Sequence, residues 1–593
     1  MPSATYQQRL STYSDQYKAL NEKLGWLSFI RLALFIGIIG FGYYYLANDQ
    51  WVALIIALLM FGIFIYCIRL YDVLKGKADF AKALMNINST EIQFLNGEGT
   101  DYADGKEHID PHHPYSYDLD LFGDGSLYKF LNRTTTIFGK EKLAKDLVQP
   151  DTTQIKQRQE AIKELSRKLD FRHDMQAFGS IHVADPKDLD KLKDWISATP
   201  TFTRDLSYFL LLVFPLTTIG VLIAYFFTDS ERLLNIFFSL FTLNLFVTFS
   251  FARKMMKQVS ISTAVTKVLQ QFAGQLKTIE KESFTSPLLQ ELQGRLQQDT
   301  VTASQSIKKL ASLFGYLDFI MNLAVSIVLN GLFIFHVHIL FSLDKWKKNN
   351  AHKIMNWLQV IGEFEALGCF GNMAFNNPPF CYPQVSAKEE LVATEMGHPL
   401  IRAGKRVNND ISFQQEKFVV LTGSNMSGKS TFLRTLGINL VLARTGSAVC
   451  AKTFTLFPYD LHVSMRITDS LQDSESLFYA ELKRLHSIIE HLHADRKTFI
   501  ILDEILRGTN SQDKHNGTVG LITKLATYQA CGIIATHDLT IADMSAQYPL
   551  YMGNKCFESI IVNDELLFDY KLKEGVCSKL NASFLMKRMG IID

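Results

Sequence analysis

The stretch that decides the fold of the last third of the chain is TGSNMSGKST, Thr422 to Thr431. Its central part fits the pattern GxxxxGK[ST], in which glycines let backbone N–H groups turn inward around phosphate groups. A short β-branched run, Phe418 to Leu421, precedes the loop and a helical stretch follows it, as this motif requires. The pattern predicts that Lys429 reaches the β and γ phosphates of a nucleotide and that the Ser430 hydroxyl ligates magnesium. The residues expected to hold the phosphates are Gly423, Gly428, Lys429, Ser430 and Thr431.

Two further apolar runs end in polar side chains. Thr498 to Leu502 is followed by Asp503 and Glu504. A buried strand that delivers two carboxylates at its C-terminal end suits a magnesium ATPase, with Asp503 holding the metal through water and Glu504 deprotonating the attacking water. The other run ends at His537, which would place an imidazole near a γ-phosphate, although a histidine at a strand end is more often structural than catalytic.

The chain changes character along its length. From Phe413 onward, short β-branched runs alternate with helical stretches, which predicts a parallel sheet covered by helices. Between Ile261 and Ile279, apolar residues fall three and four positions apart, which predicts one face of a long helix. Leu127 to Met175 has a similar helical character, interrupted at Pro150.

Four apolar segments approach the length of about 20 residues that crosses the hydrocarbon of a bilayer. The first two are Trp26 to Ala47, interrupted only by Arg31, and Trp51 to Ile68. A second pair occupies Leu206 to Phe227 and Leu233 to Ala252. Because each pair is joined by a few polar residues, the pattern predicts two transmembrane hairpins.

Cationic residues flank both hairpins mostly on one side. They are Lys18, Lys23, Arg31, Arg69, Lys75, Lys77, Arg204, Arg253, Lys254 and Lys257. By the positive-inside rule, the termini and the loop between the hairpins face the cytoplasm. The sequence therefore predicts a multi-pass protein of the cell inner membrane, held by four helices, with its phosphate-loop domain and both termini cytoplasmic.

Two alternatives to this topology are weaker. A cleavable signal peptide would need a small-x-small site before the second apolar run, which the sequence lacks. Buried core helices rarely come as four such runs in two charge-flanked pairs. A fifth run, Phe319 to Leu343, contains two asparagines and two histidines, and one further crossing would place the phosphate loop outside the cell. We therefore expect this run to be a buried helix of a soluble domain.

Composition sets broad limits. At 593 residues with 47% hydrophobic content, the chain is too long for one compact core. Its 61 basic and 59 acidic residues give a net charge of +2, which predicts no global attraction to nucleic acid or anionic lipid. Seven dispersed cysteines without a CxxC pair argue against a disulfide framework or a zinc site.

Several segments together resemble a known family. The loop, DSLQDSESLFYAEL at 469–482, LDEILRGTN at 502–510 and ATHD at 535–538 resemble the ATPase domain of MutS proteins, which are relatives of ABC-type ATPases. Further similar segments lie at 127–134, 151–165, 397–400, 408–411 and 568–590, the last resembling a dimer-forming tail. The resemblance covers roughly two thirds of the chain and is most specific in the ATPase region.

The resemblance implies roles for particular residues. It assigns Asp503 and Glu504 to metal and water, and His537 to sensing the γ-phosphate. It implies that Ser476 acts in trans on the ATP of a partner chain, so a homodimer is expected, although Ser474 or Ser476 could equally be only a helix cap. Further residues that it implies are the interface segment Asn510–Asp513 and the nucleotide contacts Asn425, Arg406 and Asn409.

The chain also departs from the family pattern. Ser474 stands where a glycine is usual, and Arg406 stands where an aromatic commonly lies near the adenine, although a guanidinium can stack on a base. The first hairpin occupies the place of the mismatch-reading domain with its Phe-x-Glu element, and the second occupies that of the DNA clamp. A C-terminal Smr nuclease domain is expected to be absent.

The predicted fold class is multidomain, with membrane helical hairpins, an all-α MutS-like core and an α/β phosphate-loop domain of ABC type. The expected segments are an N-terminal helix (1–25), a first hairpin (26–70), a connecting segment (71–116), the first half of the helical core (117–205), a second hairpin (206–252), the second half of the helical core (253–385) and the ATPase domain with its tail (386–593).

Three functions fit these expectations, in this order. The first is a membrane-anchored MutS-like ATPase that uses ATP and Mg to drive a clamp-like change on DNA, in a mismatch-repair-related role. Lys345, Lys347 and Lys348 would meet phosphates, although such runs are usually solvated faces. The second is an ATP-driven switch that acts on a protein partner or the membrane without DNA. The third is an ABC-like transporter. The interiors of the hairpins lack the charged residues that would mark a transport pathway.

Overall fold

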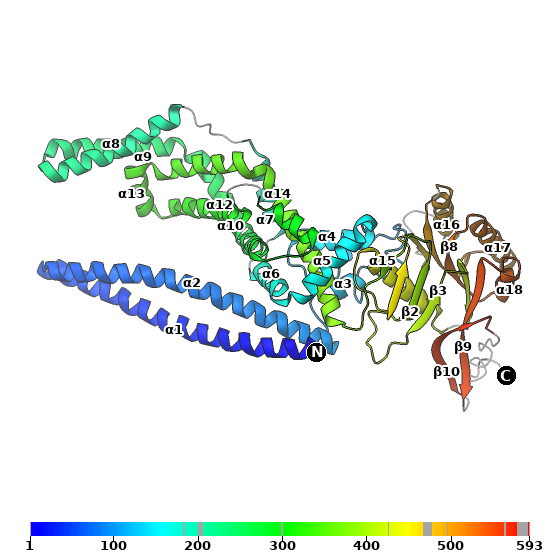
Figure 1. The fold of residues 1–593 in the computed structure, drawn as a ribbon. Helices are drawn as coiled ribbons and strands as arrows, with labels where there is room; N and C mark the ends of the chain where they lie inside the picture. The colour runs from blue at the N-terminus through cyan, green and yellow to red at the C-terminus, as the bar shows by residue number, and fades with distance from the viewer. Residues whose placement is uncertain are drawn as a thin grey trace.

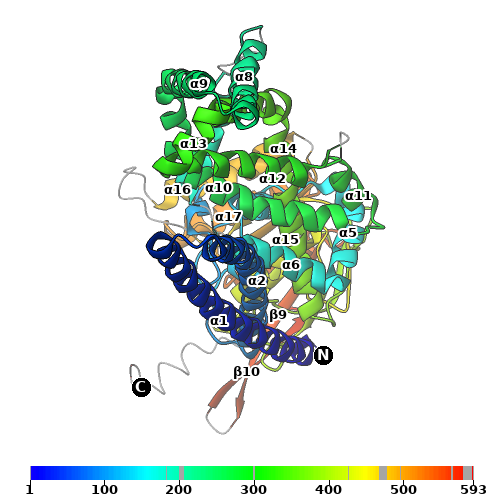
Figure 2. The same ribbon diagram turned by 90° about the vertical axis from the view of Figure 1, so that its left-hand side faces the viewer.

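The computed structural model has an elongated shape in which two helical hairpins, a helical core and a sheet domain follow one another (Figure 1). The structure describes residues 2–181, 183, 185–199, 206–297, 301–424, 426–466, 477–494, 496–562, 565–577 and 591. Both hairpins extend from the core toward the same end of the molecule, and the sheet domain lies at the opposite end (Figure 1). The view along the molecule shows the two hairpins on different sides of the core (Figure 2).

The first hairpin consists of α1 (Pro2–Asn48) and α2 (Trp51–Asn96), which lie side by side. Asp49, with φ 52°, turns the chain between them. α2 continues well beyond its apolar segment and ends at Gly97, which has φ 70° and donates its N–H to Phe94 O at 2.9 Å. Glycine is the residue that takes this left-handed conformation without a Cβ clash, so the helix stops there.

The second hairpin consists of α8 (Leu206–Thr228) and α9 (Glu231–Ser250). By length and composition, four described helices are apolar enough to cross a membrane: α1, α2, the part of α8 from Leu211 and α9. Between 11% and 17% of the residues in the most apolar window of each are buried. Most side chains of these windows therefore face outward rather than into a protein core.

The core between the hairpins and the sheet domain is helical, as expected. Its helices are α3 (Leu127–Leu131), α4 (Ile137–Val148), α5 (Ile155–Arg167), α6 (Leu169–Ile181), α7 (Pro186–Ser197), α10 (Ala252–Lys281), α11 (Pro287–Gly294), α12 (Ala303–Leu317) and α14 (Phe335–Asn376), with 3-10 turns η1 (Lys106–His108) and η2 (Thr152–Gln154). The helical face predicted between Ile261 and Ile279 is confirmed, since Val265, Phe272 and Leu276 are buried. α4 ends just before Pro150, which cannot continue the hydrogen-bond pattern.

The run from Phe319 to Leu343 is not one buried helix, and that expectation is wrong. It is divided into η3 (Asp318–Met321), α13 (Leu323–Phe333) and the start of α14. The Asn322 side chain accepts from Val325 N at 3.2 Å and so caps a new helix after η3. Ile334, with φ 48°, separates α13 from α14. Most of α13 is exposed, so the run has a solvent- or lipid-facing surface.

The C-terminal region contains two sheets. The smaller has the order β1 (Gln384–Val385), β5 (Thr453–Leu456), β2 (Leu391–Met396), β3 (Asn409–Ser412). The larger has the order β10 (Glu565–Glu574), β9 (Met552–Val562), β4 (Phe418–Gly423), β8 (Cys531–Thr536), β7 (Thr498–Asp503), β6 (Asp460–Ser464). Five of these strands are parallel and β10 returns antiparallel to β9.

Helices cover both faces of the larger sheet (Figure 1). They are α15 (Lys429–Arg444), α16 (Leu477–His493), α17 (Ser511–Thr527), α18 (Leu539–Ala542) and the 3-10 turn η4 (Asp543–Ala546). Alternate residues of β4 enter different cores, with Val419 and Leu421 in one and Phe418 and Val420 in the other. The predicted strands β4, β7 and β8 are buried throughout, which explains why they contain uninterrupted apolar runs.

Candidate functional site

The polar residues predicted from the strand ends meet at one edge of the larger sheet. β4, β8 and β7 are adjacent and parallel, so their carboxyl ends lie together. This arrangement places the loop after β4, the carboxylates after β7 and His537 after β8 around one point. Ligands of open parallel sheets bind beyond the carboxyl ends of the strands, so this edge is the expected position of a site.

The loop between β4 and α15 needs glycine at two positions. Gly423 has φ 154°, and a Cβ there would lie 2.8 Å from Phe557 O and 2.9 Å from Ser427 Oγ. Gly428 has φ 103° and is the N-cap of α15, where a Cβ would lie 3.0 Å from the Tyr570 ring. The loop therefore ends at the N-terminus of a helix, whose free N–H groups and dipole favour an anion.

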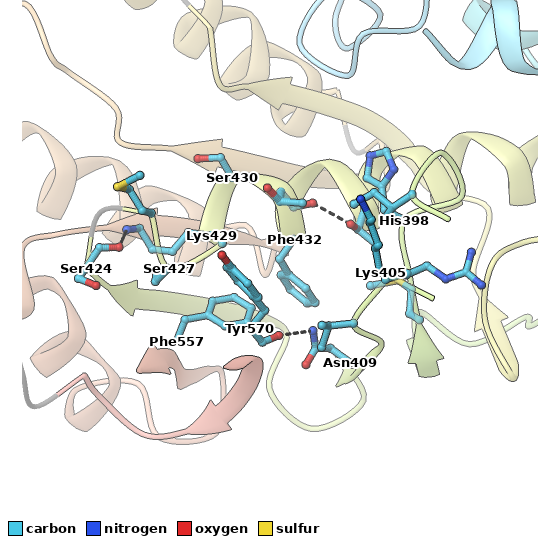
Figure 3. Close-up of a pocket in the computed structure, with 18 of the residues that line it drawn as sticks. His398, Lys405, Asn409, Ser424, Ser427, Lys429, Ser430, Phe432, Phe557 and Tyr570 are labelled. Atoms are coloured by element: carbon cyan, nitrogen blue, oxygen red, sulfur yellow. Dashed lines mark hydrogen bonds between the residues drawn. The ribbon is translucent and has the colours of Figure 1, made fainter. Parts of the chain in front are cut away.

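Lys429 lies folded over this loop. Its side chain is buried, and Nζ donates to Gly423 O at 2.9 Å and to Ser424 O at 3.0 Å. Burial lowers the pKa of the ammonium, while Glu504 and Asp503 nearby act in the opposite direction. The lysine therefore lies among the loop residues that line the cavity (Figure 3).

Ser430 and Asp503 form the candidate metal position. Ser430 Oγ donates to Asp503 Oδ2 at 2.6 Å, and burial raises the pKa of Asp503. Among the described residues, Asp503 Oδ1 is buried without a hydrogen-bond partner, as are the hydroxyls of Ser424 and Ser427. Buried oxygens without partners are costly, and an oxygen-only donor set is the kind that Mg²⁺ takes. The residues therefore fit a magnesium–phosphate group.

Glu504 and His537 form a pair beside this position. His537 Nε2 lies 2.6 Å from Glu504 Oε1, and this hydrogen bond lowers the pKa of Glu504 to about 2. Since Nε2–H is donated to the carboxylate, Lys429 Nζ at 3.5 Å from the same nitrogen makes a contact rather than a second strong bond. Glu504 has φ 49°, a conformation that costs a non-glycine residue about 1–3 kcal/mol. The fold thus holds this carboxylate in a strained and fixed position.

A cavity of about 420 Å³ extends from the loop toward the smaller sheet. Met426, Ser430, Thr431 and Glu504 line one part of it, and His398, Lys405, Arg406 and Asn409 line the other. Arg406 therefore lies at the cavity, with its guanidinium 5.5 Å from the centre of the Phe380 ring, and its contact with a nucleotide stays a prediction. Burial lowers the pKa of His398 to about 4, so this lining imidazole is neutral at neutral pH. The cavity combines an anion-binding end with a mixed polar and apolar end (Figure 3).

Asn409 holds a neighbouring segment rather than pointing freely into the cavity. Its Nδ2 donates to Tyr570 O at 3.0 Å, and its Oδ1 accepts from Leu572 N at 2.8 Å. These bonds fix Tyr570, which lies between the loop and Asn409 (Figure 3). Tyr570 has φ 53° and lies where the register of β10 shifts between Phe568 and Leu572.

Tyr570 and His398 are cavity residues that the sequence did not predict. For Tyr570 a signal is present, namely an aromatic residue within FDYKLKEG, but that segment is recognisable only as a piece of a dimer-forming tail. For His398 the signal is its segment, GHPL at 397–400, which carries only a resemblance. Neither residue could be placed at the loop without knowing how β10 and the smaller sheet fold against β4.

The other predicted residues either lie outside the part of the chain that the structure describes or begin a helix. Asn425, Ser474 and Ser476 lie outside the described residues, so their expected roles stay predictions. Asn510 is the N-cap of α17, where its side chain accepts from Asp513 N at 2.9 Å. The segment Asn510–Asp513 is therefore a helix start as well as an expected interface.

A loop of the helical core reaches the helices around the site. Asp118, which is fully buried, pairs with Arg484 of α16 and accepts from the backbone N–H of Arg466 at 2.8 Å. Asp120 pairs with the Arg466 side chain and lies 3.3 Å from Arg434 of α15. Asp120 thus contacts α15, the helix after the phosphate loop. Asp118 contacts α16, the helix after the segment expected to act in trans.

The same region of the chain also contacts the first hairpin. Glu91 of α2 is fully buried and pairs with the buried Arg133, which follows α3. Glu91 also accepts from Asn376 Nδ2 at 2.9 Å and from Tyr102 at 3.2 Å. The segment between α2 and α4, which we call the connector (residues 97–136), therefore joins the hairpin helix α2 to the site helices α15 and α16.

The fold and site together define a mostly helical multidomain protein with a glycine-loop site at a parallel sheet edge. Residues 116–324 match the family model for MutS domain III, and residues 419–587 match the model for MutS domain V. The chain belongs to the MutS family. This confirms the resemblance predicted from the loop and the segments after it.

Relatives with curated names align to a limited region of the chain. The DNA mismatch repair protein MutS of Thermotoga neapolitana is 29% identical over 230 residues, which cover 37% of this chain and 28% of that protein. DNA mismatch repair protein MSH6 of Arabidopsis thaliana is 28% identical over 260 residues, 40% of this chain and 20% of that protein. Human MutS protein homolog 4 is 29% identical over 212 residues, which cover 34% of this chain and 22% of that protein. The matched region thus spans less than a third of each relative.

Proposed function

We propose that this protein is a membrane-anchored, magnesium-dependent ATPase of the MutS type that works as a homodimer and acts on DNA. The observation that carries the ATPase assignment is the meeting of Lys429, the Ser430–Asp503 pair and the Glu504–His537 pair at one sheet edge. Each of these groups has a defined task in phosphoryl transfer to water.

The residues divide the chemistry among them. The loop N–H groups and Lys429 would hold the phosphates, and Ser430 and Asp503 would hold Mg²⁺. When bound, the metal neutralises charge on the β and γ phosphate oxygens. Glu504, an ionised carboxylate because its pKa is about 2, orients the attacking water and accepts its proton. His537 fixes Glu504 through the 2.6 Å bond, and the family resemblance implies that it would also sense the γ-phosphate.

The other end of the cavity suits the nucleoside. Tyr570 and Arg406 offer two flat surfaces for a base, one aromatic and one guanidinium. The resemblance of 469–482 supports completion of the site by Ser476 of a second chain, and hence the homodimer. The hairpins support a position in the inner membrane with the site on the cytoplasmic side, since the cationic residues flank them on the core side.

DNA is proposed as the substrate because several aligned relatives are named DNA mismatch repair proteins. A titration of the full-length protein in detergent with fluorescent duplex, mismatched and branched DNA at several salt concentrations tests this assignment. We expect binding that weakens steeply as salt rises, because phosphate contacts release counterions. Binding to none of these DNAs at low salt would remove DNA from the proposal and leave the ATPase assignment intact.

A second candidate, an ATP-driven switch that acts through the membrane helices, is favoured by the connector. Its aspartates contact α15 and α16, and Arg133 at its other end holds Glu91 of α2. A fluorophore on Asn48→Cys, in the turn of the first hairpin, would report the state of that hairpin. The switch predicts an ATP-dependent signal that Asp120→Asn reduces while ATP hydrolysis continues. An identical signal with and without ATP would contradict it.

A further inference from the structure

The fifth apolar run forms an exposed surface, and its contacts with the second hairpin indicate what covers that surface. We define the elbow as η3, α13 and the turn at Ile334, residues 318–334. We propose that the elbow lies flat in the interface of the bilayer on the core side, with its apolar face among the acyl chains and the lysines of α12 and α14 at anionic headgroups. This inference rests on the proposed anchoring of α8 and α9 in a membrane.

The exposed side of α13 and of the end of η3 is mainly apolar, and the exposed polar residues of the elbow, Asp318 and Asn322, lie at its start. Met321 is 74% exposed, Leu323 is 73% exposed and Val328 is 52% exposed. The sequence contains no Asp, Glu, Lys or Arg between Asp318 and Asp344. A contiguous uncharged surface of this kind is unusual on a protein that faces water, and it marks a contact with another apolar phase.

The elbow is fixed to the second hairpin, which identifies that phase. Asn244 of α9 donates to Gly331 O at 2.7 Å and to Thr218 of α8 at 3.0 Å. A Cβ at Gly331 would lie 2.2 Å from the Phe241 ring, so α13 and α9 pack too closely for any larger residue there. A bilayer that surrounds α8 and α9 must therefore also meet α13.

The contact with α9 also sets the depth of the elbow. Asn244 lies six residues before Ser250, where α9 ends and the chain enters the core through α10. At 1.5 Å per residue, Asn244 is about 9 Å from the core-side end of α9. Helices that lie in the membrane plane have their apolar face buried by about 5–10 Å. The elbow therefore lies at the depth of an interfacial helix.

The elbow enters and leaves on the same side. α12 and α13 meet at 112°, and α13 runs across the direction of α12 and α14, joining their ends (Figure 1). α12 and α14 then run back together into the core, where Trp346 Nε1 donates to Ser306 O at 2.9 Å. A crossing would need the two helices to lie on opposite sides of the bilayer.

Exposed lysines lie at the level expected for headgroups. Lys308 and Lys309 are exposed on α12, and Lys345 and Lys348 are exposed on α14. Lys309 and Lys345 lie about 12 to 15 Å along their helices from the elbow, which is slightly more than its depth. Lys347, by contrast, is buried with Nζ 4.9 Å from the centre of the Trp195 ring. Lys308, Lys309 and Lys345 are therefore suited to anionic lipid headgroups, whereas Lys348 lies farther from the elbow.

The test places a polarity-sensitive fluorophore on the full-length protein in nanodiscs that contain phosphatidylglycerol and lipids spin-labelled near the headgroup. Three variants with one added cysteine are compared with the unsubstituted protein, whose native cysteines are mostly buried. They are Leu323→Cys on the elbow, Phe246→Cys on α9, where the native side chain is 71% exposed, and Gln305→Cys on the exposed face of α12. We expect quenching at Leu323→Cys and Phe246→Cys and none at Gln305→Cys.

The outcomes separate the two proposals. Quenching at Phe246→Cys without quenching at Leu323→Cys would overturn the elbow and leave the membrane anchor standing. Quenching at neither position would overturn both. A charge reversal, Lys309→Glu with Lys345→Glu, is expected to reduce quenching at Leu323→Cys. If it leaves quenching unchanged and weakens DNA binding instead, the lysines serve DNA and the headgroup assignment is wrong.

Discussion

Among single residues, Glu504 combines a left-handed backbone with a short bond to His537, and both features fix its carboxylate at the phosphate loop. Glu504→Gln keeps the size and the hydrogen-bonding capacity but removes the proton acceptor. We expect ATP to remain bound while hydrolysis falls by about 10²–10⁴-fold. Nucleotide retention on a filter and phosphate release in a single turnover measure the two effects, and normal turnover would refute the assigned role.

Lys429→Ala is expected to weaken nucleotide binding itself. The change removes a buried ammonium whose charge-assisted bonds are worth about 1.5–3 kcal/mol, which corresponds to a roughly 10- to 100-fold loss of affinity. Titration with a fluorescent ATP analogue measures this loss. Lys388→Ala, which removes an exposed lysine of the same domain, is the matched control and should bind normally.

The raised pKa of Asp503 predicts how the affinity for Mg²⁺ depends on pH. Burial raises its pKa, so on acidification Asp503 takes up a proton at a higher pH than an ordinary aspartate. Glu504, with a pKa of about 2, stays ionised over the same range. The apparent Mg²⁺ affinity should therefore begin to fall, on acidification, at a higher pH than an ordinary aspartate with a pKa of about 3.9 would give. An affinity that stays constant until about pH 4 would show that Asp503 is not the metal-binding group.

The predicted residues that the structure brings together are those whose position follows from the end of one strand. Lys429 and Ser430 begin α15 after the loop that follows β4, and Asp503 and Glu504 lie at the end of β7. The motif and the order of parallel strands were therefore enough to bring them together. Tyr570 depends on a register shift in β10 and on two bonds from Asn409, which no local pattern specifies. Ser476 depends on a second chain, so its role stays a prediction.

Among elements, the pair Glu91–Arg133 attaches α2 to the core, and both side chains are nearly inaccessible to water. Glu91→Ala would leave the Arg133 guanidinium buried without its counter-ion. We expect a loss of stability of about 3–5 kcal/mol. Thermal unfolding in detergent measures the loss, and Asp124→Ala, whose partner Lys129 is on the surface, should leave stability nearly unchanged. Equal effects of the two changes would contradict a structural role for the buried pair.

Helices and strands were predicted best where one pattern covers a whole segment, namely the three- and four-residue spacing of α10 and the uninterrupted apolar runs of β4, β7 and β8. The run at Phe319 to Leu343 was predicted wrongly because its apolar character is continuous while its backbone is not. Asn322 starts a new helix, and Asn330 accepts from the backbone N–H of His336 at 3.1 Å across the turn at Ile334. These side-chain bonds divide the run, and hydropathy alone does not record them.

For the whole molecule, both hairpins extend from the core toward the same end (Figure 1). This predicts that the two hairpin turns lie on one side of the membrane and the sheet domain on the other. A membrane-impermeant thiol reagent should label Asn48→Cys and Ser230→Cys, which lie in the two hairpin turns, from outside intact cells. Lys388→Cys in the sheet domain should react only after the membrane is opened. The native cysteines are mostly buried, so the unsubstituted protein provides the background. Labelling of Lys388→Cys in intact cells would reverse the topology.

α2 has a mechanical consequence that follows from its length. It is one unbroken helix of 46 residues, about 70 Å long, whereas the hydrocarbon of a bilayer is about 30 Å thick. If the proposed anchoring holds, more than half of α2 stands outside the lipid, on the side where Glu91 is paired with Arg133 of the core. Because α2 is a single helix held at its core end, a tilt of that end would also move its other end. Motion of the core would then reach the opposite face of the membrane.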